Sequence, residues 1–282
     1  MSEIRRIKKI LSSRPTSDGA GVKLKRVFSN GETDLTDPFL LLDFFGSDNP
    51  KDYIAGFPWH PHRGIETITY MLKGQVKHED SLGNGGTIES GDCQWMTAGS
   101  GIIHQEMPDS ADGAMMGFQL WANLPSSQKM MHPRYRDVKE SDIPVVKSEE
   151  GIIIKIVAGE YCGVLGPVKE IVTEPEYLDV YIPPHGEFRH SIKSEHNAFA
   201  YVFEGQGIFS GDMDVKSDRL VIFDEGDEIV VKTGDCSIRF LLISGKPIGE
   251  PIAWYGPIVM NTREELEEAF REYREGTFIK HD

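Results

Sequence analysis

Short runs of β-branched and aromatic residues recur along the chain, and each run is bounded by glycine, proline, aspartate or asparagine. Strands typically have this length and composition. Many short strands separated by turn residues predict a β-sandwich or a β-barrel. The clearest predicted strands span residues 67–72, 152–157, 177–182, 199–203, 229–231 and 238–243. We therefore expect an all-β protein.

One helix is predicted near the C-terminus. Thr262 can cap it, and Glu265 three residues later completes a capping box. Glutamates in the first turn complement the helix dipole. An apolar stripe follows at helical spacing and consists of Leu266, Ala269, Phe270 and Tyr273. We expect this helix to pack against a β-barrel, and we assign it no chemistry.

A weak internal repeat suggests two related domains. Residues 70–74 (YMLKG) resemble 201–205 (YVFEG), and residues 89–92 (ESGD) resemble 224–227 (DEGD). Both pairs are offset by about 130 residues, the size of one small barrel domain. Acidic residues, serine and proline collect near residues 139–150, where we place the junction. The predicted divisions are a first barrel at 1–140, a second barrel at 141–260, and a packing helix with its tail at 261–282.

The charge balance narrows the range of functions. The 282 residues include 30 Lys+Arg and 45 Asp+Glu, which gives a net charge of −15. Nucleic-acid phosphates and anionic membranes repel such a chain, so we expect no direct binding to either. A basic N-terminal stretch is a candidate contact surface for a protein partner, although a solvated strand edge explains it more simply. This basic stretch comprises Arg5, Arg6, Lys8, Lys9, Lys23, Lys25 and Arg26.

Cysteine usage and the lack of long apolar runs indicate the compartment. Cys93, Cys162 and Cys236 are far apart and odd in number, which argues against a disulfide framework and favours a reducing compartment. No apolar run approaches the ~20 residues of a membrane span. The N-terminal residues lack the apolar core of a secretory signal. We expect a cytoplasmic protein, and nuclear residence stays open.

Two pairs of polar residues, each with a spacing of two, form the strongest chemical pattern. His60 and His62 lie in FPWHPHRG, and His104 and Glu106 lie in GIIHQEMP. Side chains two apart on a strand point to the same face, so each pair can share a face. A core histidine needs only one or two hydrogen bonds and usually occurs singly. The two pairs therefore predict a metal site of three imidazoles and one carboxylate.

The ligand types leave the metal open. Three nitrogens and one oxygen, with no thiolate, suit iron(II), manganese, nickel, copper or zinc. A six-coordinate iron(II) site would keep two positions open for a substrate oxygen and dioxygen. Glu66 is a rival ligand, and His78 is a further candidate that we expect beside the site or on the surface. The second half of the chain lacks paired ligands, so we expect one metal, in the first barrel only. The histidines of that half include His185, His190 and His196.

Several long motifs resemble the pirin family of cupins. They are DPFLLLDFFG, HPHRGIETITYMLKG, HED, GDCQWMTAGSGIIHQEMP, GFQLWANLPSS and YGPIVMNTREEL, and they extend over nearly the whole chain. The resemblance implies a bicupin: two stacked antiparallel β-barrels of jelly-roll type, a C-terminal packing helix, and one iron centre in the first barrel. It also implies a ligand set that disfavours Glu66. The implied ligands are His60, His62, His104 and Glu106.

The resemblance implies two candidate functions. The first is a quercetin 2,3-dioxygenase, in which Glu106 takes the proton of a flavonol 3-hydroxyl, dioxygen adds to the activated ring, and carbon monoxide leaves. A planar aromatic substrate needs an apolar cleft. The candidate lining residues are Phe57, Trp95, Met96, Phe118 and Trp121. The second function is a non-catalytic, iron-dependent redox-sensing co-regulator that binds protein partners. We expect a monomer, since the two barrels of one chain already pack on each other.

Overall fold

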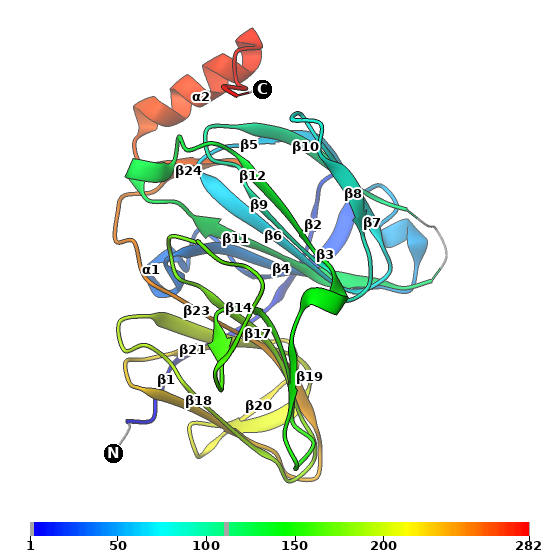
Figure 1. Ribbon diagram of the computed structural model, residues 1–282, viewed down its shortest axis with the longest axis vertical. Coiled ribbons are helices and arrows are strands. Elements are labelled where there is room, and N and C mark those ends of the chain that lie inside the picture. Colours follow the sequence, from blue (N-terminus) through cyan, green and yellow to red (C-terminus); the bar gives the residue numbers. More distant parts are fainter. Residues whose placement is uncertain (1–2, 110–112, 282) are drawn as a thin grey trace. The chain divides into compact units, whose positions relative to one another are not determined.

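β-Strands make up most of the computed structural model, which describes residues 3–109 and 113–281 (Figure 1). Neighbouring strands within its sheets pair antiparallel. The helices among the described residues are α1 (Thr33–Thr36) and α2 (Arg263–Glu275). Neither of them has the length and hydropathy that crossing a membrane requires. The all-β prediction is confirmed.

The described residues form two compact units that are not contiguous in sequence. The smaller unit consists of residues 3–13, Glu32–Pro38 and Ser141–Pro247. The larger unit consists of Arg14–Gly31, Phe39–Glu140 and residues 248–281. One boundary between these units, after residue 140, coincides with a boundary of the predicted ranges. At the ends of the chain the units differ from those ranges, because residues 3–13 lie in the smaller unit and residues 248–281 in the larger one.

The smaller unit contains one ten-stranded sheet around a single apolar core. Its main path runs through β1 (Ile7–Ser12), β21 (Arg219–Phe223), β19 (Asn197–Phe209), β23 (Ile238–Gly245), β17 (Glu176–Ile182), β14 (Ile153–Ala158) and β13 (Val145–Lys147). The remaining strands are β18 (Glu187–Ser191), β20 (Met213–Lys216) and β22 (Glu228–Lys232), with the separate hairpin β15 (Glu160–Tyr161) and β16 (Val164–Leu165). Because β1 pairs with β21, the N-terminal strand is part of this unit.

The larger unit contains two sheets that share buried apolar side chains. The seven-stranded sheet has the order β12 (Arg134–Val138), β9 (Cys93–Thr97), β6 (Ile65–Lys73), β11 (Met115–Asn123), β4 (Phe39–Ser47), β3 (Val22–Phe28) and β2 (Arg14–Asp18). The four-stranded sheet has the order β5 (Phe57–His62), β10 (Ile102–Pro108), β7 (Val76–Asp80) and β8 (Gly85–Ile88). Leu24 and Met71 of the first sheet pack in one cluster with Val76 and Ile88 of the second. The two sheets therefore enclose a common interior.

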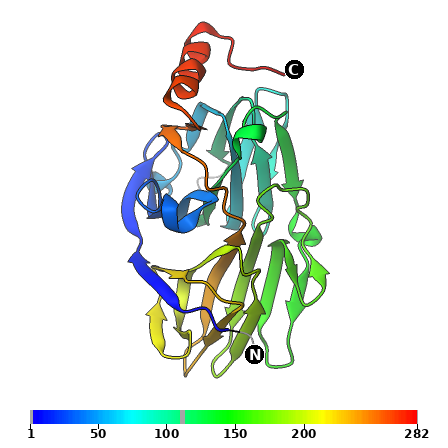
Figure 2. The same ribbon diagram turned by 90° about the vertical axis from the view of Figure 1, so that its left-hand side faces the viewer.

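The C-terminal segment belongs to the larger unit. Its hairpin of β24 (Ala253–Tyr255) and β25 (Ile258–Met260) leads into α2 (Figure 2). Thr262 Oγ1 accepts a hydrogen bond from the Glu265 amide, and the Glu265 carboxylate accepts one from the Thr262 amide, so the predicted capping box is present. Ala269 is fully buried, and Phe270 packs in the same cluster. The helix is the packing element that the sequence predicts.

Candidate metal centre

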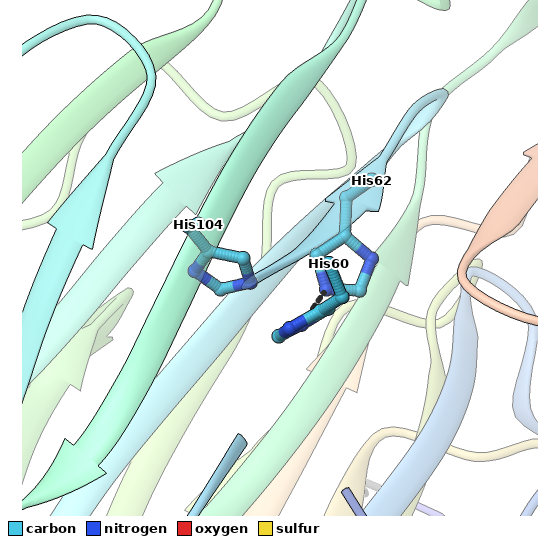
Figure 3. Close-up of side chains that lie close together, drawn as sticks. All are labelled: His60, His62 and His104. Carbon is cyan, nitrogen blue, oxygen red and sulfur yellow. Dashed lines mark hydrogen bonds between the residues drawn. The ribbon is translucent and has the colours of Figure 1, made fainter. Parts of the chain in front are cut away.

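Strand register brings the two predicted polar pairs together. β5 pairs antiparallel with β10, and His60 stands opposite His104. Because side chains alternate along a strand, His62 lies on the face of His60, and Glu106 lies on the face of His104. Figure 3 shows the imidazoles of His60, His62 and His104 gathered between these two strands.

The imidazole nitrogens are spaced to bind one ion. One ring nitrogen from each of the three histidines lies within 4.8 Å of the other two. Nε2 of His60 is 3.1 Å from Nε2 of His62. Two nitrogens bound at right angles to one ion, each about 2.1 Å from it, lie about 3 Å apart. The described residues contain no second group of this kind.

Backbone acceptors fix the tautomers of two of these histidines. Nδ1 of His60 is 2.8 Å from the Pro58 carbonyl oxygen, and Nδ1 of His62 is 2.9 Å from the Pro257 carbonyl oxygen. A carbonyl only accepts, so each Nδ1 carries the proton and each Nε2 presents a lone pair. The two Nε2 lone pairs, 3.1 Å apart, cannot hydrogen-bond to each other. A cation bound by both nitrogens would offset their repulsion. His104 Nε2 is likewise buried without a hydrogen-bond partner. The donor set therefore fits a metal ion.

Burial keeps two of these imidazoles, those of His62 and His104, neutral. It lowers the pKa of His62 well below the ordinary value, and neighbouring His60 lowers that pKa further, against the hydrogen bond to Pro257. Burial also lowers the pKa of His104 well below the ordinary value, and the three nearby imidazoles add to the effect. Neutral imidazole is the form that binds a metal.

Glu106 lies on the cavity wall beside this group. Thr69 Oγ1 is 2.8 Å from Glu106 Oε1 and 2.8 Å from the oxygen of the Gln119 amide as assigned. A hydroxyl has one proton, so Thr69 donates to the carboxylate while the amide is turned to donate its NH2 to Thr69. The chain Gln119–Thr69–Glu106 holds one carboxylate oxygen in place. The carboxylate is not part of the three-histidine group, and its role as a ligand stays a prediction.

Gly64 lets the C-terminal hairpin approach the loop that follows His62. Its φ is +77°, and a Cβ there would lie 1.9 Å from the Val259 carbonyl oxygen. The Val259 amide in turn donates to the Arg63 carbonyl. Lys129 Nζ donates to the carbonyls of Gly64 and Val259 and to the side chain of Asn123. Glycine is needed here by both space and backbone conformation.

Arg63 joins the histidine loop to the end of the chain. Its guanidinium is 2% exposed and donates to the Ser100 and Phe278 carbonyls. It also forms an ion pair of 2.7 Å with Glu272 on α2 and lies over the Phe278 ring. The C-terminal helix, to which we assigned no chemistry, therefore supports the residue next to His62.

A cavity of about 660 Å³ opens beside the histidines. His60, His62 and Glu106 line it together with four aromatic side chains, namely Phe45, Phe57, Trp121 and Trp254. The Trp121 ring lies 5.0 Å from that of His62 and 5.8 Å from that of Trp254. Three charged residues also line the cavity. Arg26 forms a bidentate ion pair with Asp43 and donates a further hydrogen bond to Asp18.

The structure divides the predicted pocket residues into two groups. Phe57 and Trp121 line the cavity. Trp95, Met96 and Phe118 are buried and are not among its lining residues. On β11, Gln119 and Trp121 face the cavity, so Phe118 points to the other face of the sheet.

The rival ligand candidates take other positions. Glu66 is buried on β6, where its carboxylate accepts a hydrogen bond from Thr97, and it is not in the histidine group. Burial raises the pKa of Glu66, and the Thr97 hydrogen bond opposes this. His78 is fully buried on β7 with its Nδ1 3.4 Å from Nδ1 of His104. His78 is therefore beside the site and not on the surface.

The basic stretch does not form one free surface. Arg5 is 1% exposed and donates to backbone carbonyls of its own unit, including those of Lys193 and His196. Arg26 lines the cavity and is paired with Asp43. Neither of these two arginines is available to a protein partner.

Sequence reasoning missed the part played by the C-terminal hairpin. Pro257 supplies the acceptor that orients His62, and Trp254 forms part of the cavity wall. Both positions lie in or next to the motif YGPIVMNTREEL, but no spacing in the sequence connects them to the histidines. Only the path of the folded chain does so.

Two family models match the chain. The model described as pirin covers residues 21–122, and that described as the pirin C-terminal cupin domain covers residues 177–279. A Pseudomonas aeruginosa protein that carries quercetin 2,3-dioxygenase as a provisional name is 43% identical over 282 residues, covering 98% of this chain and 99% of that protein. A pirin-like protein of Caulobacter vibrioides is 43% identical over 276 residues, with the same coverage.

A solved structure has the same fold. The crystal structure of quercetin 2,3-dioxygenase from Acinetobacter baumannii matches with a TM-score of 0.91 at 32% identity and covers 98% of both chains. Together with the matches to the pirin and pirin C-terminal cupin models, this confirms the predicted bicupin fold.

Proposed function

The chain belongs to the pirin family, and from that premise we propose that it is a mononuclear metal dioxygenase that cleaves a flavonol such as quercetin with O2 and releases CO. The observation that carries this proposal is the convergence of three imidazoles beside an aromatic cavity, with free Nε2 lone pairs on His60 and His62. The names of the related Pseudomonas and Acinetobacter proteins support it.

We assign the metal to His60, His62 and His104, with Glu106 as the fourth ligand. Iron(II) is the metal that we propose, and manganese, nickel, copper and zinc are the alternatives that the same ligands accept. When bound, the metal supplies Lewis acidity toward a substrate oxygen and a means of activating dioxygen. The Pro58 and Pro257 carbonyls hold two of the ligand rings in the tautomer that this binding needs.

Glu106 is the base in this proposal. Thr69 donates to its Oε1, which leaves Oε2 to take the proton of the 3-hydroxyl. The hydrogen bond from Thr69 fixes the direction of this carboxylate. Because Glu106 is 6% exposed, bulk water competes little for that proton.

The aromatic wall suits a planar substrate. Trp121 and Trp254 offer two ring faces at an interplanar angle of 40°, and Phe57 adds a third apolar side chain. A cavity of about 660 Å³ falls within the range of about 300 to 1,000 Å³ that small-molecule sites occupy. The polar members, Gln119 and Asp43 among them, can meet the hydroxyl groups of a polyphenol.

The test is the loss of quercetin absorbance in air, with carbon monoxide trapped, using iron(II)-loaded protein. His60→Ala should abolish turnover. His185→Ala is the matched control, because the His185 side chain is 73% exposed and lies outside the histidine group. Full iron occupancy without turnover in the unaltered protein would overturn the proposal and favour a non-catalytic iron-dependent redox sensor that binds protein partners. Undiminished turnover in His60→Ala would reject this metal site.

A further inference from the structure

A second buried histidine lies directly behind the ligand His104. His78 and Asp80 are two apart on β7, and β7 pairs with β10 so that Asp80 stands opposite His104 and His78 opposite Glu106. Nδ1 of His78 is 3.4 Å from Nδ1 of His104. Nε2 of His78 is 3.6 Å from Oδ2 of Asp80, and both side chains are 0% exposed. The three residues form a continuous buried row.

Asp80 is anchored independently of the histidines. Its Oδ1 accepts hydrogen bonds of 2.9 Å from the amides of Leu82 and Asn84, and its Oδ2 accepts one of 2.9 Å from the Asn84 side chain. These bonds stabilise the ionised carboxylate in a fixed direction. His78 Nε2 has no hydrogen-bond partner among the described residues. The anchored carboxylate is therefore a fixed charge near that nitrogen.

This charge decides which ring nitrogen of the His78 imidazole faces the carboxylate as a donor. A carboxylate favours a proton on the ring nitrogen nearest to it, so Nε2 is protonated and Nδ1 keeps a lone pair. That lone pair can only accept, so the Nδ1 of His104 must carry the proton in the 3.4 Å contact. The Nε2 of His104 is then left with its lone pair free for the metal. The opposite tautomers would place a proton on the ligand nitrogen.

We propose that His78, directed by Asp80, is a positioning residue of the metal centre: it holds His104 in the tautomer and orientation that binds the metal. The inference rests on the metal site of the proposed function and adds two residues to it. Tyr135 packs against the other side of the His78 ring, with ring centroids 5.1 Å apart, which limits its movement. Partners behind a ligand of this kind typically raise metal affinity by about 10- to 100-fold.

The test is the iron(II) affinity of the full chain, measured anaerobically by competition with a coloured chelator. His78→Leu should weaken binding by about 10- to 100-fold. His78→Asn places an amide oxygen where Nδ1 was, so it should accept from His104 and recover most of that loss. Asp80→Asn should weaken binding as well, because the fixed charge that selects the tautomer is gone.

Two controls separate positioning from stability. His196→Leu makes the same change at a buried histidine of the smaller unit and should leave the affinity unchanged. The melting temperature of each metal-free variant reports folding directly. If His78→Leu binds iron as tightly as the unaltered chain, or if His78→Asn binds no better than His78→Leu while both fold, the inference is wrong. If the unaltered chain binds no iron, the proposed function fails instead.

Discussion

Gly64→Ala should damage the larger unit far more than an ordinary glycine substitution. The left-handed backbone costs a side-chain-bearing residue about 1–2 kcal/mol. In addition, the new Cβ would lie 1.9 Å from the Val259 carbonyl oxygen, and ordinary contact begins at 3.4 Å. Moving the Cβ and the Val259 carbonyl apart would strain two hydrogen bonds of Val259, one from Lys129 to its carbonyl and one from its amide to the Arg63 carbonyl. Each contributes about 1 kcal/mol. We expect a total loss of about 3–4 kcal/mol in the free energy of unfolding.

Gly276→Ala is the matched control, because Gly276 has a φ of +75° and nothing lies within 4 Å of its Cβ position. It should cost only the backbone term. The assay is urea denaturation of the metal-free protein followed by tryptophan fluorescence, which reports this unit alone. All the tryptophans belong to it, namely Trp59, Trp95, Trp121 and Trp254.

The same experiment has a second readout. Moving the Val259 segment also moves Pro257, whose carbonyl orients His62, so Gly64→Ala should weaken metal binding by about tenfold or more. Equal losses of stability in Gly64→Ala and Gly276→Ala would refute the steric reasoning. A Gly64→Ala protein with undiminished metal affinity would refute the link between the hairpin and His62.

Two further predictions concern buried polar groups. Thr69→Val removes the donor to Glu106 and should lower the turnover of iron-loaded protein by about 10- to 100-fold, the value of a hydrogen bond to a charged group. Thr97→Val removes the corresponding hydrogen bond to Glu66 and should leave turnover intact. If Thr97→Val and Thr69→Val lost turnover equally, Glu66 would again be a candidate for the site. Burial lowers the pKa of Lys129 from 10.5 to about 7, so between these pH values the unfolded chain holds a proton that the folded protein has released. The free energy of unfolding should therefore rise with pH across that window, by at most about 1.4 kcal/mol per pH unit, and Lys129→Met should flatten the rise. Urea denaturation at several pH values from 7 to 10 measures this dependence. A flat profile in the unaltered protein would contradict the prediction.

The sequence predicts what depends on local periodicity. A spacing of two on a strand places His60 beside His62 whatever the rest of the chain does, and motif likeness assigns His104 to the same site. The C-terminal helix is equally local, because its capping box and apolar stripe lie within twelve residues. These features need no knowledge of the fold beyond the strand or helix that carries them.

Long-range pairing decides the rest. Phe118 and Trp121 are close in sequence, yet only the register of β11 determines which of them faces the cavity. The predicted ranges of the two barrels placed β24 with the second barrel, whereas its contacts are with the larger unit. The sequence marks His78 as a candidate beside the site or on the surface, but it cannot decide between these positions, because the cross-strand neighbour of His78 pairs with it only in the folded sheet.

The contact between His62 and Pro257 also sets an order of events during synthesis. These residues are 195 positions apart in the chain. At about 5 to 20 residues per second, the ribosome adds Pro257 about 10 to 40 s after His62. During that interval His62 lacks the acceptor that selects its tautomer, and Arg63 lacks the Glu272 carboxylate. The nascent chain therefore carries the three histidines before it has a finished site, and we expect only the completed polypeptide to bind the proposed metal.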